Sequence, residues 1–141
     1  MKIVVVDAQG GGLGKGIIER LKSAFGSRVE ICAVGTNVLA TQQMLKGGAD
    51  AGATGENAVV FNAGRADVII GSIGIIAANA MLGELTPAMA AAIASSPAQK
   101  ILIPYNKCHL MVAAPTEPLQ NSIERMVHMV AQLLEKQGET L

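Results

Sequence analysis

A glycine-rich segment with the chemistry of an anion site opens the chain. Residues 3–19 read IVVVDAQGGGLGKGIIE, in which an apolar run is followed by three consecutive glycines and a fourth, Gly14. Glycines directly after a buried strand let the backbone turn sharply, and the unpaired N–H groups at the start of the next helix then point to one place. The helix dipole adds positive charge there. The segment therefore predicts an anion site of the kind that holds a nucleotide phosphate.

This turn matches known phosphate-binding fingerprints only in part. Aligned on Gly14, the G-x-G-x-x-G pattern has Gln9 in place of its first glycine. The segment from Asp7 is also similar to the T-G-x-x-x-G-x-G turn of short-chain dehydrogenases, although Asp7 replaces the threonine. The phosphate loop G-x-x-x-x-G-K-[ST] shares Gly14 and Lys15, but a glycine follows in place of the hydroxyl residue. The candidate phosphate-binding residues of this turn are Gln9, Gly10, Gly11, Gly12, Leu13, Gly14 and Lys15.

The same glycines have a purely structural explanation, in which they only let the helix pack closely against the strand. Three glycines in a row are costly in backbone entropy for that purpose alone, and this cost favours the ligand site. On the ligand interpretation, a bulky residue at Gly11 abolishes ligand binding and leaves the fold intact.

The end of the second predicted strand bears on which nucleotide the turn suits. An NAD site carries an Asp or Glu about 20 positions past the glycines, and residues 34–37, VGTN, supply no acid. Thr36 and Asn37 are hydrogen-bond donors for a 2′-phosphate, and Ser72 is a further polar candidate at the end of a later strand. NADP is therefore a candidate cofactor, beside a mononucleotide or another phosphorylated ligand.

The other reactive side chains form no recognisable catalytic or metal-binding set. We expect Asp7 to accept hydrogen bonds from the glycine loop, because an anion that touched phosphate would be repulsive. Cys108 and His109 are adjacent, and adjacent strand residues point to opposite faces, so no metal site is predicted. Asn79 either pairs with nearby backbone or faces the crevice. No catalytic residue is assigned.

Composition indicates one uncharged, aliphatic domain over residues 1–141. Half of the residues are hydrophobic, with two Phe, one Tyr and no Trp, and 11 basic residues balance 11 acidic ones. This balance argues against a nucleic-acid or membrane-surface partner. The chain begins on a predicted core strand, which leaves no room for a signal peptide, and no apolar stretch suits a membrane span. We therefore expect a cytoplasmic protein with reduced thiols.

Strand and helix patterns alternate along the chain. The expected strands are 3–6, 29–34, a short one near 50–53, 67–71 and 100–103; the expected helices are 12–25, 38–46, 54–61, 75–82, 87–94 and 118–137. A turn at 105–107 is expected to return residues 110–114 as an antiparallel edge strand. The alternation predicts a three-layer, doubly wound, Rossmann-like α/β fold with a mainly parallel sheet of order 3-2-1-4-5.

In that topology a ligand lies at the carboxyl ends of the strands, where the strand order reverses. The polar residues expected at these ends are Asp7, Gln9, Thr36, Asn37, Glu56, Asn57, Ser72, Asn106 and Lys107. Capping of the following helix is the simpler explanation for Asn37, Thr54 and Thr86.

Four segments together resemble a bacterial family that is catalogued only as a domain of unknown function: DAQGGGLGKG, GTNVLAT, GATGENAVV and GSIGIIAANAMLGELTP. The likeness covers nearly the whole chain. It implies a Rossmann-like cytoplasmic protein, and it carries over no activity, substrate or catalytic residue.

Three functional hypotheses follow. The first is a small nucleotide- or dinucleotide-binding protein whose phosphate is held by the glycine turn. The second is an oligomeric scaffold with an empty crevice, since the predicted helices 75–82 and 87–94 have almost no charge and favour a homodimer. The third is an NADP-dependent reductase whose site is completed across the dimer.

Overall fold

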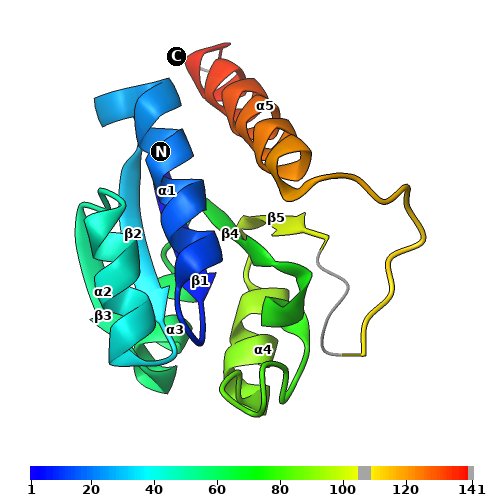
Figure 1. Cartoon of the computed structure of the whole chain (residues 1–141). Coiled ribbons are helices and arrows are strands. Elements are labelled where there is room, and N and C mark those ends of the chain that lie inside the picture. The colour runs from blue at the N-terminus through cyan, green and yellow to red at the C-terminus, as the bar shows by residue number, and fades with distance from the viewer. Residues whose placement is uncertain (105–108, 140–141) are drawn as a thin grey trace.

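The protein is a three-layer α/β structure, seen here in a computed structural model that describes residues 1–104 and 109–139 (Figure 1). The strands are β1 (Lys2–Asp7), β2 (Glu30–Gly35), β3 (Ala51–Thr54), β4 (Val68–Ser72) and β5 (Gln99–Ile103). The helices are α1 (Gly12–Phe25), α2 (Val38–Lys46), α3 (Glu56–Ala63), α4 (Pro87–Ser95) and α5 (Leu119–Glu139), with short 3-10 helices η1 (Gly26–Arg28) and η2 (Ile73–Ile76).

All five strands are parallel and lie in the order β3-β2-β1-β4-β5, which confirms the predicted topology. The central strand β1 pairs on one side with β2, where Val5 is opposite Ala33, and on the other with β4, where Val5 is opposite Ile70. The chain reverses its direction of growth between β1 and β4. A ligand crevice is therefore expected at the carboxyl ends of these two strands.

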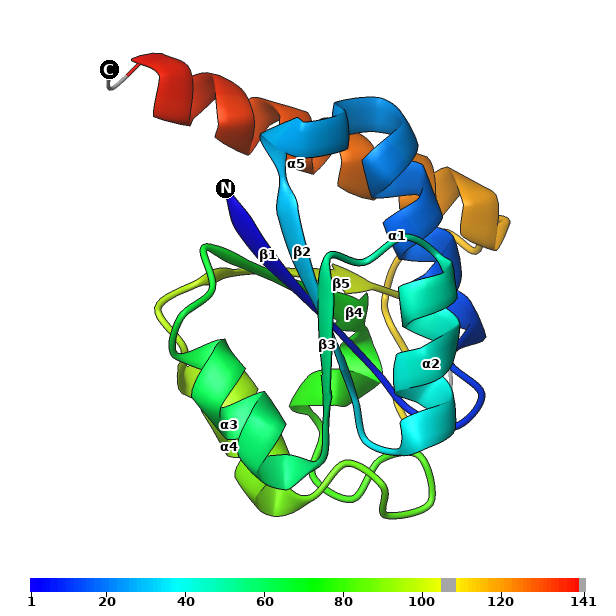
Figure 2. The same ribbon diagram turned by 90° about the vertical axis from the view of Figure 1, so that its left-hand side faces the viewer.

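Helices cover both faces of the sheet, and β1 supplies side chains to both cores. Ile3 and Val5 are buried in the core shared with α1, α2 and α5, whereas Val4 and Val6 are buried in the core shared with α3 and α4. Figure 2 shows these two groups of helices on opposite sides of the strands. Burial on both faces explains why β1 is a continuous apolar run without polar alternation.

The predicted helix over residues 75–82 is wrong. After η2 the chain forms a tight loop in which Asn79, Met81 and Leu82 have positive φ values of 65°, 57° and 58°. A left-handed backbone cannot continue a right-handed helix, so an apolar composition alone gave the wrong prediction here. The residues 77–85 are called the crevice loop below.

The predicted antiparallel strand over residues 110–114 is also wrong. This segment has no strand pairing, and Figure 1 shows the part of it that leads into α5 lying away from the sheet. Met111 in this segment is 93% exposed, so its side chain does not pack on the sheet. The predicted turn at 105–107, with Asn106 and Lys107, lies outside the described residues, as does Cys108.

Part of the apolar surface that favoured a homodimer is core within this domain. Helix α4 buries Met89, Ala90 and Ile93 against the core that it shares with α3. Leu82 in the segment 75–82 is 97% exposed, and further exposed apolar side chains lie on α2 and α3, where Val38 is 62% and Phe61 is 57% exposed. The homodimer stays a prediction.

Gly11 sets the closest approach between the glycine turn and α2. Its φ is +72°, and a Cβ atom there would lie 2.7 Å from the backbone oxygen of Ala40. The expectation that a bulky residue at this position leaves the fold intact is therefore not supported by the packing.

We expect Gly11→Ala to lower the free energy of unfolding by about 2 kcal/mol or more, because alanine adds a left-handed backbone penalty and a backbone collision. Gly16→Ala is the matched control. Gly16 lies inside α1, where a Cβ added to it would have no atom within 4 Å. Its replacement by alanine is expected to raise the free energy of unfolding by about 0.5 to 1 kcal/mol. Urea unfolding followed by circular dichroism measures both variants. Equal stability of the two variants would contradict this role for Gly11.

Candidate functional site

The turn between β1 and α1 is held by the carboxylate of Asp7. One oxygen, Oδ1, accepts a hydrogen bond from the N–H of Ala8 at 2.8 Å, and Oδ2 accepts one from the N–H of Gly14 at 2.7 Å. The expected structural role of Asp7 is thereby confirmed. Burial raises the pKa of this carboxyl, the two backbone N–H groups partly oppose the rise, and the charge of Glu84 adds to it.

Two backbone N–H groups in the first turn of α1 remain available to a ligand. Gly14 donates to Asp7 and Lys15 donates to the carbonyl oxygen of Gly11 at 3.0 Å. Within the described part of the chain, the N–H groups of Gly12 and Leu13 have no acceptor. Adjacent unpaired N–H groups at a helix N-terminus attract an anion, and the helix dipole adds to that attraction.

The glycines of the turn fall into two groups. Gly11 and Gly14 are needed for packing, since a Cβ on Gly14 would lie 2.5 Å from Sδ of Met44. Gly10 and Gly12 have no atom within 4 Å of an added Cβ, so packing does not require them to be glycine. The structural explanation therefore holds for the first pair, and open space in front of the backbone distinguishes the second pair.

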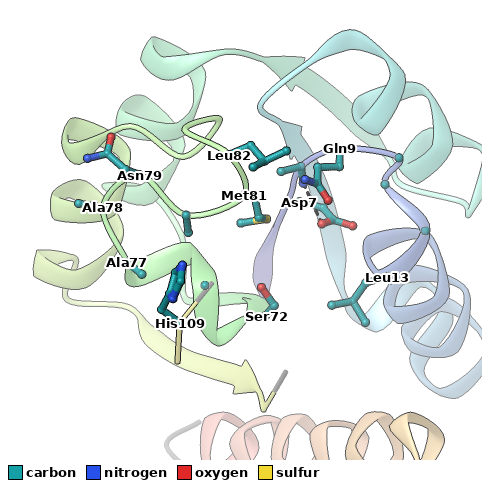
Figure 3. A pocket seen from close by; sticks show the side chains of 16 residues that line it. Asp7, Gln9, Leu13, Ser72, Ala77, Ala78, Asn79, Met81, Leu82 and His109 are labelled. Carbon is teal, nitrogen blue, oxygen red and sulfur yellow. Dashed lines mark hydrogen bonds between the residues drawn. The ribbon is translucent and has the colours of Figure 1, made fainter. Parts of the chain in front are cut away.

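Gly10 and Gly12 also line a cavity of about 950 Å³ between the turn and the crevice loop. Figure 3 shows Met81 and Leu82 facing Asp7 and Gln9 across it, with Ser72 and His109 at another side. Small-molecule sites commonly have volumes of about 300 to 1,000 Å³. The cavity lies at the carboxyl ends of β1 and β4, where the topology predicts a ligand crevice.

The structure brings most of the predicted site residues together at this cavity, and leaves four outside it. The predicted residues that line the cavity are Gln9, Gly10, Gly11, Gly12, Leu13 and Ser72; those that do not are Gly14, Lys15, Thr36 and Asn37. The side chain of Lys15 lies beside Glu19, with 3.9 Å between Nζ and Oε1. No described Lys or Arg lines the cavity, so an anion there would depend on backbone N–H groups and on polar side chains such as Ser72.

Thr36 and Asn37 are instead bound to an acid from the crevice loop. Oε1 of Glu84 accepts hydrogen bonds from Oγ1 of Thr36 at 2.8 Å, from Nδ2 of Asn37 at 2.7 Å and from the N–H of Gln9 at 3.0 Å. Partial burial raises the pKa of Glu84, but the three hydrogen bonds outweigh it and hold the pKa below its ordinary value. The predicted capping role of Asn37 is also confirmed, because its Oδ1 accepts from the N–H of Ala40.

Sequence reasoning missed the crevice loop, Glu84 and His109 as parts of this region. Asn79, for which two roles were open, lines the cavity, and its own N–H donates to the carbonyl oxygen of Leu85 at 2.8 Å. Asn79 and Gly83 were the available signals, because asparagine and glycine are the residues that most readily adopt positive φ. No feature of the sequence near Glu84 indicates its contact with Thr36, which lies 48 positions away.

The fold and the crevice define this chain as a Rossmann-like α/β protein. The sequence profile of one family matches residues 2–135, and the chain belongs to that family, described as Domain of unknown function (DUF3842). No curated protein and no solved structure matches the chain. Over residues 1–104 and 109–139, no helix is long and apolar enough to cross a membrane, and no three His, Cys, Asp or Glu side chains are grouped as metal ligands would be.

The hydrogen bonds to Glu84 predict a specific dependence of stability on pH. Its pKa in the folded protein lies below the ordinary 4.5, so the ionised carboxylate stabilises the fold above about pH 5, and this contribution is lost as the pH falls through the lowered folded pKa. Glu84→Gln lacks that titration. We therefore expect the difference in unfolding free energy between wild type and Glu84→Gln to shrink as the pH is lowered from about 6 towards about 3. Urea titrations at several pH values measure it, and a constant difference would contradict the assignment.

Proposed function

We propose that this protein binds a nucleotide whose phosphate groups contact the backbone N–H groups of Gly12 and Leu13. The observation that carries the proposal is the coincidence of two unpaired first-turn N–H groups with a 950 Å³ cavity at the point where the strand order reverses. Either feature is common by itself. Together they provide both an attraction for an anion and a volume for the rest of the ligand.

The charge around the cavity favours phosphates of low charge. Asp7 is the only described lining residue with a carboxylate, and no described Lys or Arg opposes it. A terminal phosphate monoester carries a charge of about −1.5 to −2 at neutral pH, whereas each phosphate of a diester or pyrophosphate bridge carries one. The bridge of a dinucleotide therefore suits this site better than a terminal phosphate.

The far side of the cavity suits an uncharged, partly apolar group. Ala77, Met81 and Leu82 line the cavity, with Met81 and Leu82 facing the glycine turn (Figure 3), and Leu82 is 97% exposed. A base or another flat ring would cover these side chains. NADP stays among the ligands that we propose to test, but a 2′-phosphate would meet Thr36 and Asn37 only if these left Glu84, so dinucleotides without that phosphate come first.

A thermal-shift panel of NAD, NADP, FAD, ATP and phosphorylated sugars tests the proposal. A ligand at about 100 times its dissociation constant adds roughly 2.7 kcal/mol to the stability, which raises the melting temperature of a domain of this size by roughly 8 °C. No shift with any of these compounds would favour the oligomeric scaffold instead.

The variant Gly12→Leu tests whether the ligand binds at the glycine turn. Gly12 lines the cavity, and a Cβ added to it has no atom within 4 Å, so a larger side chain is expected to be accommodated there and to obstruct access to the first-turn N–H groups. We expect this variant to fold and to lose the thermal shift. Gly16→Leu introduces the same change in the same helix away from the cavity and should keep the shift. A shift that persists in Gly12→Leu would place the ligand elsewhere.

A further inference from the structure

We propose that Glu84 is a specificity-determining residue, which restricts the crevice to nucleotides whose ribose carries no second phosphate. This inference rests on the proposed nucleotide site and names the ligand class that this site accepts. The observation behind it is that hydrogen-bond donors from two separate segments converge on one oxygen of a carboxylate supplied by a third.

The donors around Glu84 would form a second anion site if the carboxylate were absent. The N–H of Gln9 comes from the glycine turn, whereas Oγ1 of Thr36 and Nδ2 of Asn37 come from the carboxyl end of β2. A nucleotide that lies on a turn of this topology places a ribose near the end of the second strand. The corner formed by these residues, called the Glu84 corner, is therefore where a 2′-phosphate would be recognised.

The carboxylate converts this corner from a phosphate site into a hydroxyl site. All three of these hydrogen bonds go to Oε1, and Oε2 accepts none from any described residue. Oε2 can accept a hydrogen bond from a ribose hydroxyl. A second phosphate would either displace Glu84 from its donors or lie beside a like charge, and like charges in contact are strongly unfavourable.

The backbone around Glu84 holds the carboxylate in place before any ligand arrives. The N–H of Glu84 donates to the carbonyl oxygen of Met81 at 3.2 Å, and two further backbone hydrogen bonds close the crevice loop, from Asn79 to Leu85 at 2.8 Å and from Leu85 to Ala80 at 3.2 Å. A further hydrogen bond lies directly after the loop, where Oγ1 of Thr86 donates to Oε1 of Glu56 at 2.6 Å. Discrimination by Glu84 therefore requires no movement of the loop.

A purely structural role for Glu84 makes a different prediction. If its carboxylate only anchored the crevice loop, its removal would weaken binding of all ligands of the crevice by similar factors. Selective recovery of ligands with a second phosphate is expected only if the charge itself excludes them. The ratio of two affinities therefore separates the two roles.

The first experiment uses inorganic phosphate and nitrogen-15 labelled full-length protein. In the wild type, phosphate should shift the amide resonances of Gly12 and Leu13 and leave the Gln9 amide and the Asn37 side-chain amide unchanged. In Glu84→Ala, phosphate should also shift the Gln9 and Asn37 resonances. Absence of this new response would overturn the inference about Glu84, whereas absence of the Gly12 and Leu13 response in all variants, both with phosphate and with NAD, would count against the proposed function.

The second experiment measures the affinities of NAD and NADP, which differ by a 2′-phosphate. We expect the wild type to bind NAD more tightly, and Glu84→Ala to change the ratio of the two dissociation constants in favour of NADP by at least about tenfold. Glu84→Gln keeps an acceptor oxygen and removes the charge, so it should shift the ratio in the same direction if the alanine variant does not fold.

Glu56→Ala is the matched control for the second experiment. This variant removes a carboxylate that accepts a hydrogen bond from Thr86, just beyond the crevice loop. Glu56 itself lies outside the Glu84 corner. Its NAD to NADP ratio should equal that of the wild type. An unchanged ratio in both Glu84 variants, or an equal change in Glu56→Ala, would overturn the assignment of specificity to the Glu84 charge.

Discussion

The hydrogen bonds that Asp7 accepts from the backbone determine the form of the crevice. Its carboxylate binds one N–H on each side of the glycine turn, at Ala8 and Gly14. This fixes the start of α1 against the end of β1 and leaves the N–H groups of Gly12 and Leu13 without an acceptor in the described chain. The same carboxylate is partly buried near a cavity without a described lysine or arginine, so its raised pKa is the electrostatic cost of this arrangement.

The four glycines of the turn, Gly10, Gly11, Gly12 and Gly14, differ in how closely they are packed. Gly11 and Gly14 have α2 and its side chains at contact distance, and this contact requires that both lack a Cβ. Gly10 and Gly12 face empty space. Packing therefore explains glycine at Gly11 and Gly14 but not at Gly10 and Gly12, where alanine would lower the entropy of the unfolded chain. The proposed nucleotide site would use the open pair, with the packed pair as its base.

The crevice loop joins two regions that the sequence separates widely. Its apolar residues form one wall of the cavity, while Glu84 at its far end reaches the end of β2. Positive φ at Asn79, Met81 and Leu82 is unfavourable for residues with side chains and persists only where surrounding contacts impose it. Backbone strain of this kind is frequent at binding sites, which agrees with the position of the loop over the crevice.

Local pattern in the sequence determined the parallel strands, the helices α1 to α5 to within a few residues, and the place of the glycine turn. Burial on one face leaves a helical period and burial on both faces leaves a continuous apolar run, and a short window records either. The order of the sheet followed from the alternation of strands and helices. Tertiary structure alone decided the crevice loop and the Glu84 corner. The helix predicted at 75–82 failed because apolar residues that line a cavity have the same composition as those that face a core. The contact between Glu84 and Thr36 spans 48 positions and depends on strand order and loop path together, so no local pattern encodes it.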